Sequence, residues 1–96
     1  MPQGAEAGGS VDVRLPAALV ALFPGASRRV ALSASSVAEL VAALDARWPG
    51  MADRLCDSRP AIRRHINVFV AGERASLETP LAPGAQVEIL TAISGG

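Results

Sequence analysis

Residues 36–50 read SVAELVAALDARWPG and contain the strongest local structural signal in the sequence. The apolar residues of this stretch recur at every third or fourth position, the spacing of one face of a helix: Val37, Leu40, Val41, Leu44 and Trp48. Ser36 and Glu39 fit a capping box, in which hydroxyl and carboxylate oxygens accept hydrogen bonds from backbone N–H groups at the helix start. Pro49-Gly50 is a stop signal. The stretch therefore predicts one amphipathic helix.

Alternating stretches flank this helix on both sides. Residues 11–15 (VDVRL) and 29–32 (RVAL) precede it, and residues 66–70 (INVFV) and 87–91 (VEILT) follow it. Strict alternation and β-branched content are typical of half-buried strands. Residues 51–56 predict a short second helix, and Ala71-Gly72 predicts a tight turn in which glycine supplies a positive φ. One helix among these strands predicts an α+β domain of the ubiquitin-like β-grasp type, with the helix on one face of a mixed four- to five-stranded sheet.

The alternation also assigns the strand residues to two faces. The residues expected to face the helix are Val11, Val13, Leu15, Val30, Leu32, Ile66, Val68, Val70, Val87 and Ile89. On the opposite, mostly polar face, Phe69 and Leu90 are apolar and form a candidate docking patch. We expect residues 1–10 to be a flexible N-terminal tail, 11–91 the domain, and 92–96 a flexible tail with Gly95-Gly96 at its end.

Composition excludes several classes of function. The 96 residues hold nine arginines, no lysine and nine acidic residues, so the formal net charge is zero. That balance lacks the electrostatic footprint of a nucleic-acid or membrane-surface binder. One cysteine rules out an internal disulfide and fits a reducing compartment. Neither a secretory signal nor a run of roughly 20 apolar residues is present, so we expect a cytoplasmic protein.

The residues needed for the common catalytic and metal sites are missing. His65 is the only histidine, so a zinc-binding histidine cluster is impossible. Cys56 and His65 allow a thiol–imidazole pair, although a small packing cysteine and a solvated histidine are the more ordinary interpretation. The run Arg63-Arg64-His65 is interpreted as a solvated approach to a strand. We therefore expect no enzyme activity of its own, no bound cofactor and no metal.

The Gly95-Gly96 pair is the remaining candidate. Without side chains, these residues fit a channel only as wide as a backbone. The five residues after Thr91 reach roughly 15 Å when extended, enough to carry a carboxylate into another protein's buried site. A frayed end is the alternative interpretation of Gly-Gly. The β-grasp element order favours a functional tail.

Residues 65–73 (HINVFVAGE), 81–90 (LAPGAQVEIL) and 93–96 (ISGG) resemble MoaD/ThiS-type ubiquitin-like sulfur carrier proteins. The resemblance covers Val11 to Gly96, and residues 48–55 (WPGMADRL) with 63–65 are similar to a longer, CysO-like subgroup. Ala71 departs from the pattern, since asparagine often precedes this glycine in the family. Thr91 also departs from it, standing where many members have proline.

The resemblance implies a carrier acted on by two enzymes. A ubiquitin-activating-like adenylating enzyme would use ATP and a sulfur donor to convert the Gly96 carboxylate into a thiocarboxylate. A sulfur-accepting biosynthetic enzyme would then take the sulfur for cysteine, molybdopterin, thiamine or a thio-containing metabolite, a choice that stays open. Gly95, Ser94 and Ile93 would thread the channel, and Phe69 with Leu90 would dock the partner.

Two alternatives remain open at this point. The chain is also consistent with a ubiquitin-like modifier conjugated through Gly96 to lysines of target proteins, which shares the fold and the activation step. It is further consistent with a β-grasp interaction module whose tail has no role. Because it has no lysine, the chain cannot form polymers through its own side-chain amines.

Overall fold

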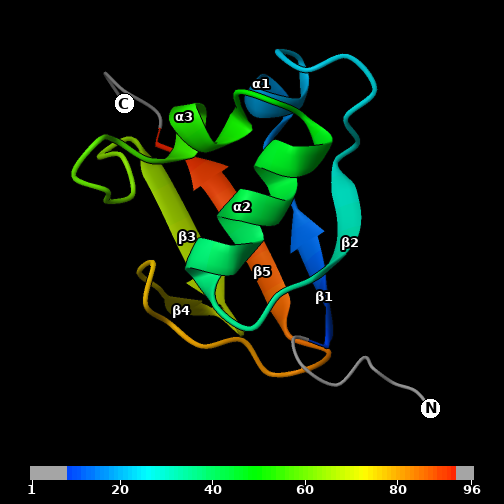
Figure 1. The fold of residues 1–96 in the computed structure, drawn as a ribbon, viewed down its shortest axis with the longest axis vertical. Helices are drawn as coiled ribbons and strands as arrows, with labels where there is room; N and C mark the ends of the chain where they lie inside the picture. Colours follow the sequence, from blue (N-terminus) through cyan, green and yellow to red (C-terminus); the bar gives the residue numbers. More distant parts are fainter. Residues whose placement is uncertain (1–8, 93–96) are drawn as a thin grey trace.

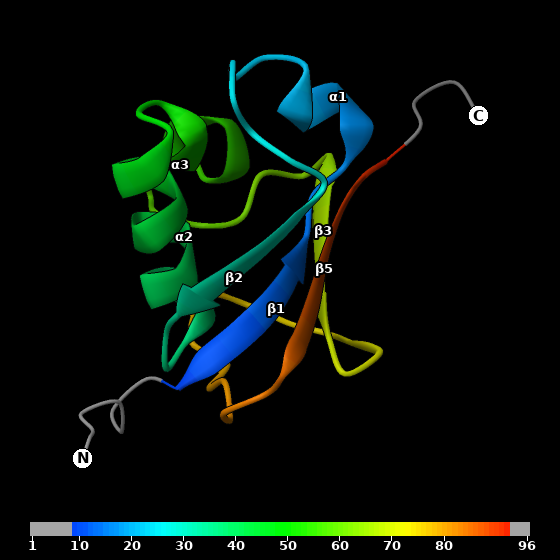
Figure 2. The ribbon, with the colours of Figure 1, turned by 90° about the vertical axis from the view of Figure 1, so that its right-hand side faces the viewer.

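Residues 9–92, the part of the chain that the computed structural model describes, form a five-stranded mixed sheet with helices on one face (Figures 1 and 2). Along the chain the elements are β1 (Ser10–Arg14), α1 (Ala17–Val20), β2 (Arg29–Ser33), α2 (Val37–Arg47), α3 (Met51–Leu55), β3 (Ile66–Val70), β4 (Glu73–Arg74) and β5 (Gln86–Thr91). Every predicted strand and helix is present to within about one residue. No helix in this part of the chain is long and apolar enough to cross a membrane.

The strand order is β2-β1-β5-β3-β4. The central pair, β1 and β5, is parallel and joins Val13 to Val87, whereas the other neighbouring strands are antiparallel. The last strand therefore lies in the middle of the sheet, between the first strand and β3. The predicted mixed sheet with one main helix on one face is confirmed, and its strand number is five.

Helix α2 begins at the predicted cap. The Ser36 hydroxyl accepts a hydrogen bond from the Glu39 backbone N–H at 3.1 Å. The Glu39 carboxylate accepts hydrogen bonds from the backbone N–H (2.9 Å) and the hydroxyl (2.7 Å) of Ser35, one residue before the expected position. The helix ends at Arg47, just before Pro49-Gly50 as predicted. The Asp45 carboxylate accepts hydrogen bonds from the Gly50 and Ala52 N–H groups and so ties α2 to α3.

The core lies between α2 and the sheet. Of the strand residues expected to face the helix, all are buried except Val70, which is partly buried because it ends β3 at the turn to β4. Helix α2 contributes Val37, Leu40, Val41 and Leu44. Further buried side chains come from segments for which the sequence predicts short helices or irregular structure: Leu19, Met51, Leu55 and Leu81.

The β3–β4 connection is a two-residue turn, Ala71-Gly72, between the paired residues Val70 and Glu73. Both turn residues have positive φ, 51° for Ala71 and 85° for Gly72. A turn of this kind matches the twist of a hairpin and prefers Asn-Gly, because alanine pays a steric cost in the left-handed region. The sequence predicted the glycine's conformation but not the strain at Ala71.

Replacing Ala71 by asparagine is expected to raise the free energy of unfolding by about 0.5–1 kcal/mol, since asparagine tolerates a positive φ better. Urea denaturation of wild type and Ala71→Asn measures the difference. Ala82→Asn, at an exposed alanine without a positive φ, is the matched control and should change stability by less than about 0.5 kcal/mol. A less stable Ala71→Asn variant would contradict the strain argument.

Candidate functional site

The last strand fixes the point from which the Gly-Gly segment continues. Thr91 of β5 pairs with Ile66 of β3, and the Ala92 N–H donates a hydrogen bond to the His65 carbonyl at 2.7 Å. The backbone is therefore held through residue 92. The predicted site residues Ile93, Ser94, Gly95 and Gly96 lie outside the described residues.

The predicted basic run lies directly beside this exit point. Arg64 and His65 are exposed, as expected for an approach to β3. Arg63 differs from its two neighbours because it makes two hydrogen bonds to α3. Its backbone N–H donates to the Leu55 carbonyl at 2.9 Å, and its Nε donates to the Asp53 carbonyl at 2.8 Å. Through these bonds the loop before β3 is fastened to α3, next to Ala92. Nothing in the local sequence pattern signals this contact, since the two segments are about ten residues apart.

The outer face of the sheet carries the predicted docking residues. Asn67 lies opposite Leu90 and Phe69 opposite Glu88, so Phe69 and Leu90 are diagonal neighbours on the face away from α2. Leu90 is 40% exposed, whereas Phe69 is half-buried. Figure 2 shows that no helix covers this face. The structure thus brings the two residues close together.

Charged side chains surround Phe69, and the sequence analysis did not assign them to the patch. The Arg74 guanidinium stands 5.8 Å from the centre of the Phe69 ring, a cation–π geometry. An Arg14 nitrogen lies 3.6 Å from a Glu88 carboxylate oxygen. A shallow cavity of about 230 Å³ is open on this face and is lined by Phe69, Gly72 and the charged residues Asp12, Arg14, Arg29 and Glu88. An aromatic ring among ion pairs is suited to contact with another protein.

Cys56 has the properties of a packing residue. It is half-buried beside an open apolar groove of about 380 Å³ between α2, α3 and the following loop, with Val41 and Leu77 among the lining residues. Burial, with a smaller effect of the Asp57 carboxylate, raises the pKa of the Cys56 thiol. A raised pKa lowers the thiolate fraction and with it the nucleophilicity. Among residues 9–92, no three His, Cys, Asp or Glu side chains gather as a metal site.

The loop after Cys56 contains a carboxyl group with a strongly lowered pKa. Asp57 accepts a hydrogen bond from the Arg59 side chain at 2.9 Å, and also from the backbone N–H groups of Arg59 and Ala61 at 3.0 Å. These interactions, with the Arg59 side chain contributing most, lower the pKa of Asp57 to about 2. They favour the ionised carboxylate over the protonated form.

We expect the Asp57 carboxyl to titrate near pH 2 in an NMR pH titration. The folded-state pKa lies below the unfolded value of about 4, so this group's stabilising effect is complete above pH 4 and is lost as pH falls toward 2. Arg59→Gln should move the titration midpoint up toward 4. Arg54→Gln removes an arginine that does not contact Asp57 and should leave the midpoint unchanged; equal midpoints in all three proteins would refute the assignment.

Comparison with known protein families identifies the family to which this chain belongs. The family model described as ThiS matches residues 13–96, which is most of the chain. The chain belongs to the ThiS family. The predicted MoaD/ThiS resemblance is thereby confirmed.

Relatives of this ThiS-family chain include the sulfur carrier protein CysO of Mycobacterium tuberculosis (strain H37Rv), which is 31% identical over 93 residues, covering 91% of this chain and 99% of CysO. The structure of the Amycolatopsis orientalis BexX/CysO complex is similar with a TM-score of 0.79 at 28% identity, covering 90% of this chain and 99% of the other. Haloferax volcanii SAMP1 gives a TM-score of 0.77 at 28% identity, covering 92% of this chain and all of SAMP1. These likenesses confirm the ubiquitin-like β-grasp fold and the CysO-like character.

Proposed function

We propose that this ThiS-family chain is a sulfur carrier whose Gly96 carboxylate is activated by an adenylating enzyme and converted to a thiocarboxylate. The observation that carries the proposal is the placement of β5, which is paired on both sides and held through Ala92. Residues 93–96 follow this fixed point with Gly95-Gly96 last in the sequence, and the family match extends through residue 96. The named sulfur carrier function of CysO, which this chain matches over almost its whole length, supports the same conclusion.

The chemistry requires activation because a carboxylate has no good leaving group. In the proposed first step, a Gly96 carboxylate oxygen attacks the α-phosphorus of ATP, and pyrophosphate leaves. Sulfide then attacks the carbonyl carbon of the acyl-adenylate; the C–O bond to AMP breaks, and the thiol proton passes to solvent. The product is a thiocarboxylate, and no atom is oxidised or reduced. ATP is bound by the ubiquitin-activating-like partner, so the carrier holds no cofactor itself.

The carrier's own contribution is recognition and reach. Four residues beyond Ala92 span about 13 Å when extended, at about 3.3 Å per residue. On the outer face of the sheet, Phe69 with Arg74 above its ring and the exposed Leu90 form the proposed docking patch for the adenylating enzyme. CysO of Amycolatopsis orientalis is found in a complex with a partner protein, BexX, which supports a role that depends on partners. A sulfur-accepting biosynthetic enzyme completes the proposed cycle.

Intact-mass analysis tests this function. The full chain is incubated with an adenylating enzyme from the same source, ATP and sulfide. The expected result is a mass gain equal to replacement of one oxygen by sulfur, located at Gly96 by fragmentation, with no gain when ATP is omitted. An unchanged mass with an enzyme that loads another carrier would reject the proposal.

The second candidate is a ubiquitin-like protein modifier, which is favoured by the likeness to the small archaeal modifier protein SAMP1. Here the acyl-adenylate would end in an isopeptide bond to a lysine of another protein, with release of AMP. Mass analysis of cellular adducts distinguishes the two, because only conjugation leaves a peptide from this chain on a target lysine. We expect no isopeptide bonds between two copies of this chain, because the chain has no lysine side chain to accept the acyl group.

A further inference from the structure

The charged side chains of the described residues separate toward two ends of the molecule. Three of the nine arginines, Arg14, Arg29 and Arg74, lie on one cross-strand row of the sheet, because Arg74 pairs with Phe69, Phe69 with Glu88, Glu88 with Arg14 and Arg14 with Arg29. The other six arginines lie toward one end of the molecule, before β2, at the end of α2, on α3 and in the loop before β3: Arg28, Arg47, Arg54, Arg59, Arg63 and Arg64. This is the end at which β5 finishes (Figure 1). We call it the exit end.

At the exit end the carboxylates are already engaged. Asp45 accepts backbone hydrogen bonds from Gly50 and Ala52, Asp57 pairs with Arg59, and Asp53 lies 3.9 Å from Arg63. Within residues 9–92, no carboxylate comes within 4 Å of Arg54 or Arg64, and both arginines are exposed. Arg63 joins α3 to the loop before β3, whose His65 carbonyl accepts the Ala92 N–H bond, so Arg54 and Arg64 lie on segments that hydrogen bonds connect to Ala92.

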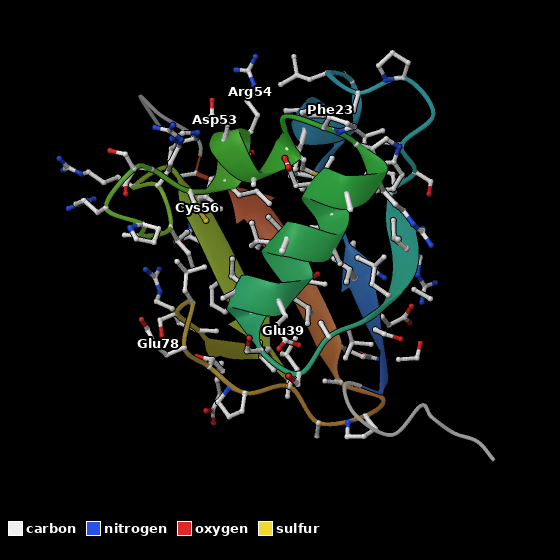
Figure 3. All side chains as sticks on the ribbon, in the orientation of Figure 1. Phe23, Glu39, Asp53, Arg54, Cys56 and Glu78 are labelled. Atoms are coloured by element: carbon white, nitrogen blue, oxygen red, sulfur yellow. The ribbon has the colours of Figure 1, made fainter. Side chains whose placement is uncertain are left out.

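The opposite end has the reverse charge. Glu39 at the start of α2, Glu73 of β4 and Glu78 of the following loop are exposed, and within the described residues none has an arginine nitrogen within 4 Å. Figure 3 shows Arg54 and Asp53 at one end of the molecule and Glu39 and Glu78 at the other. The zero net charge of the sequence therefore conceals a positive exit end and a negative opposite end.

We infer that the exit end docks on an acidic rim of the partner protein, around the channel that receives residues 93–96, through Arg54 and Arg64. The inference rests on the proposed function for the identity of that partner, the adenylating enzyme. Attraction between this end and negative charge raises the rate of productive encounters, and repulsion of the Glu39–Glu78 end disfavours approach the wrong way round. The sheet patch of Phe69 and Leu90 then adds short-range contact.

A protein partner fits this end better than a nucleic acid does. Asp53 and Asp57 lie among the arginines and would repel phosphates, and Asp53 is almost fully exposed. Single-stranded nucleic acids also need exposed aromatic rings for stacking. The three aromatic side chains, Phe23, Trp48 and Phe69, are only half-exposed, and Phe69 is on the sheet face under Arg74.

The test measures association of the full-length carrier with the adenylating enzyme by stopped-flow fluorescence. The variant Arg54→Gln/Arg64→Gln lowers the net charge by two at the exit end. The matched control Ala38→Glu/Ala82→Glu lowers it by the same amount at exposed positions near the opposite end. At about 0.1 M salt, charges act over about 10 Å. Under this condition the association rate constant of Arg54→Gln/Arg64→Gln should be about tenfold lower than that of wild type, and that of the control should differ from wild type by less than about twofold. At about 1 M salt all three rates should converge.

Equal slowing by both variants would show a net-charge effect only and overturn the inference, as would an unchanged rate for Arg54→Gln/Arg64→Gln. Sulfur loading measured at saturating enzyme is expected to be complete in both variants.

A separate experiment tests the exit end if the wild-type chain is never loaded and the proposed function fails. In that case the full-length carrier is titrated by NMR with an octaglutamate peptide and, separately, with an RNA oligonucleotide. Amide shifts at residues 54, 63–65 and 92 with the peptide support the inference; shifts with RNA alone overturn it.

Discussion

Deletion of Gly95 and Gly96 is expected to abolish sulfur loading while leaving the thermal unfolding midpoint unchanged. In the proposed mechanism the chemistry depends on the Gly96 carboxylate, so the deleted chain would offer no correctly placed acyl group to the adenylating enzyme. We expect stability to be unaffected, because the described contacts that hold β5, its pairing with β3 and the Ala92 N–H bond to the His65 carbonyl, do not involve the deleted residues. Intact mass after the loading reaction and a thermal melt measure the two effects. Loading of the deleted chain at the wild-type rate would favour an interaction module.

A bulky substitution separates the two glycines' roles. Gly95→Trp keeps the Gly96 carboxylate but adds a side chain that a channel of backbone width excludes, so loading should fall by at least about 100-fold, about 3 kcal/mol of lost binding. Ala82→Trp, at an exposed loop position remote from Ala92, is the control and should load normally. Normal loading of Gly95→Trp would contradict threading, and equal losses in both variants would indicate a general defect.

Leu44→Ala is expected to lower the free energy of unfolding by about 3 kcal/mol. This value lies within the range of about 2–5 kcal/mol that is typical when a fully buried leucine is replaced by alanine. Leu44 is completely buried on the face of α2 that packs on the sheet. Its truncation removes apolar contacts and leaves a cavity that neighbours on fixed strands fill poorly. Urea denaturation monitored by circular dichroism gives the difference directly.

Leu22→Ala is the matched control for Leu44→Ala. Leu22 follows α1 and is 51% exposed, so the same chemical change removes little buried surface and should cost less than about 0.5 kcal/mol. Similar losses at the two positions would contradict the burial seen in the structure. A Leu44→Ala protein that still loads sulfur when folded would separate the role of the core from that of the tail.

Elements with a strong local pattern were predictable from the sequence. The stretch 36–48 combines a cap with a helical apolar stripe, and residues 66–70 alternate, so α2 and β3 agree with expectation nearly residue for residue. The outward placement of Phe69 and Leu90 followed from the same alternation and is confirmed. The role of Gly95 and Gly96 stays a prediction, because these residues lie outside the described part of the chain.

What the sequence could not reveal depends on contacts between distant segments. Pairing of Val13 with Val87 sets the middle of the sheet, yet no local pattern encodes that parallel register. The Arg74 side chain reaches Phe69 only because the two-residue turn at 71–72 returns β4 alongside β3. The separation of charge between the two ends likewise appears only when all the elements are assembled, which is why the total charge was a poor guide.

The central position of β5 has a consequence for how the protein matures. Because the last strand to be synthesised inserts between β1 and β3, the sheet cannot be completed until almost the whole chain is available. Pairings between the two halves of a chain form late and slowly compared with local ones. The same insertion fixes Ala92, the last residue that the structure describes, so Ala92 is held in place only when the sheet is complete. Under the proposed function, incomplete or misfolded copies would therefore be poor substrates for the activating enzyme, a form of quality control that arises from topology alone.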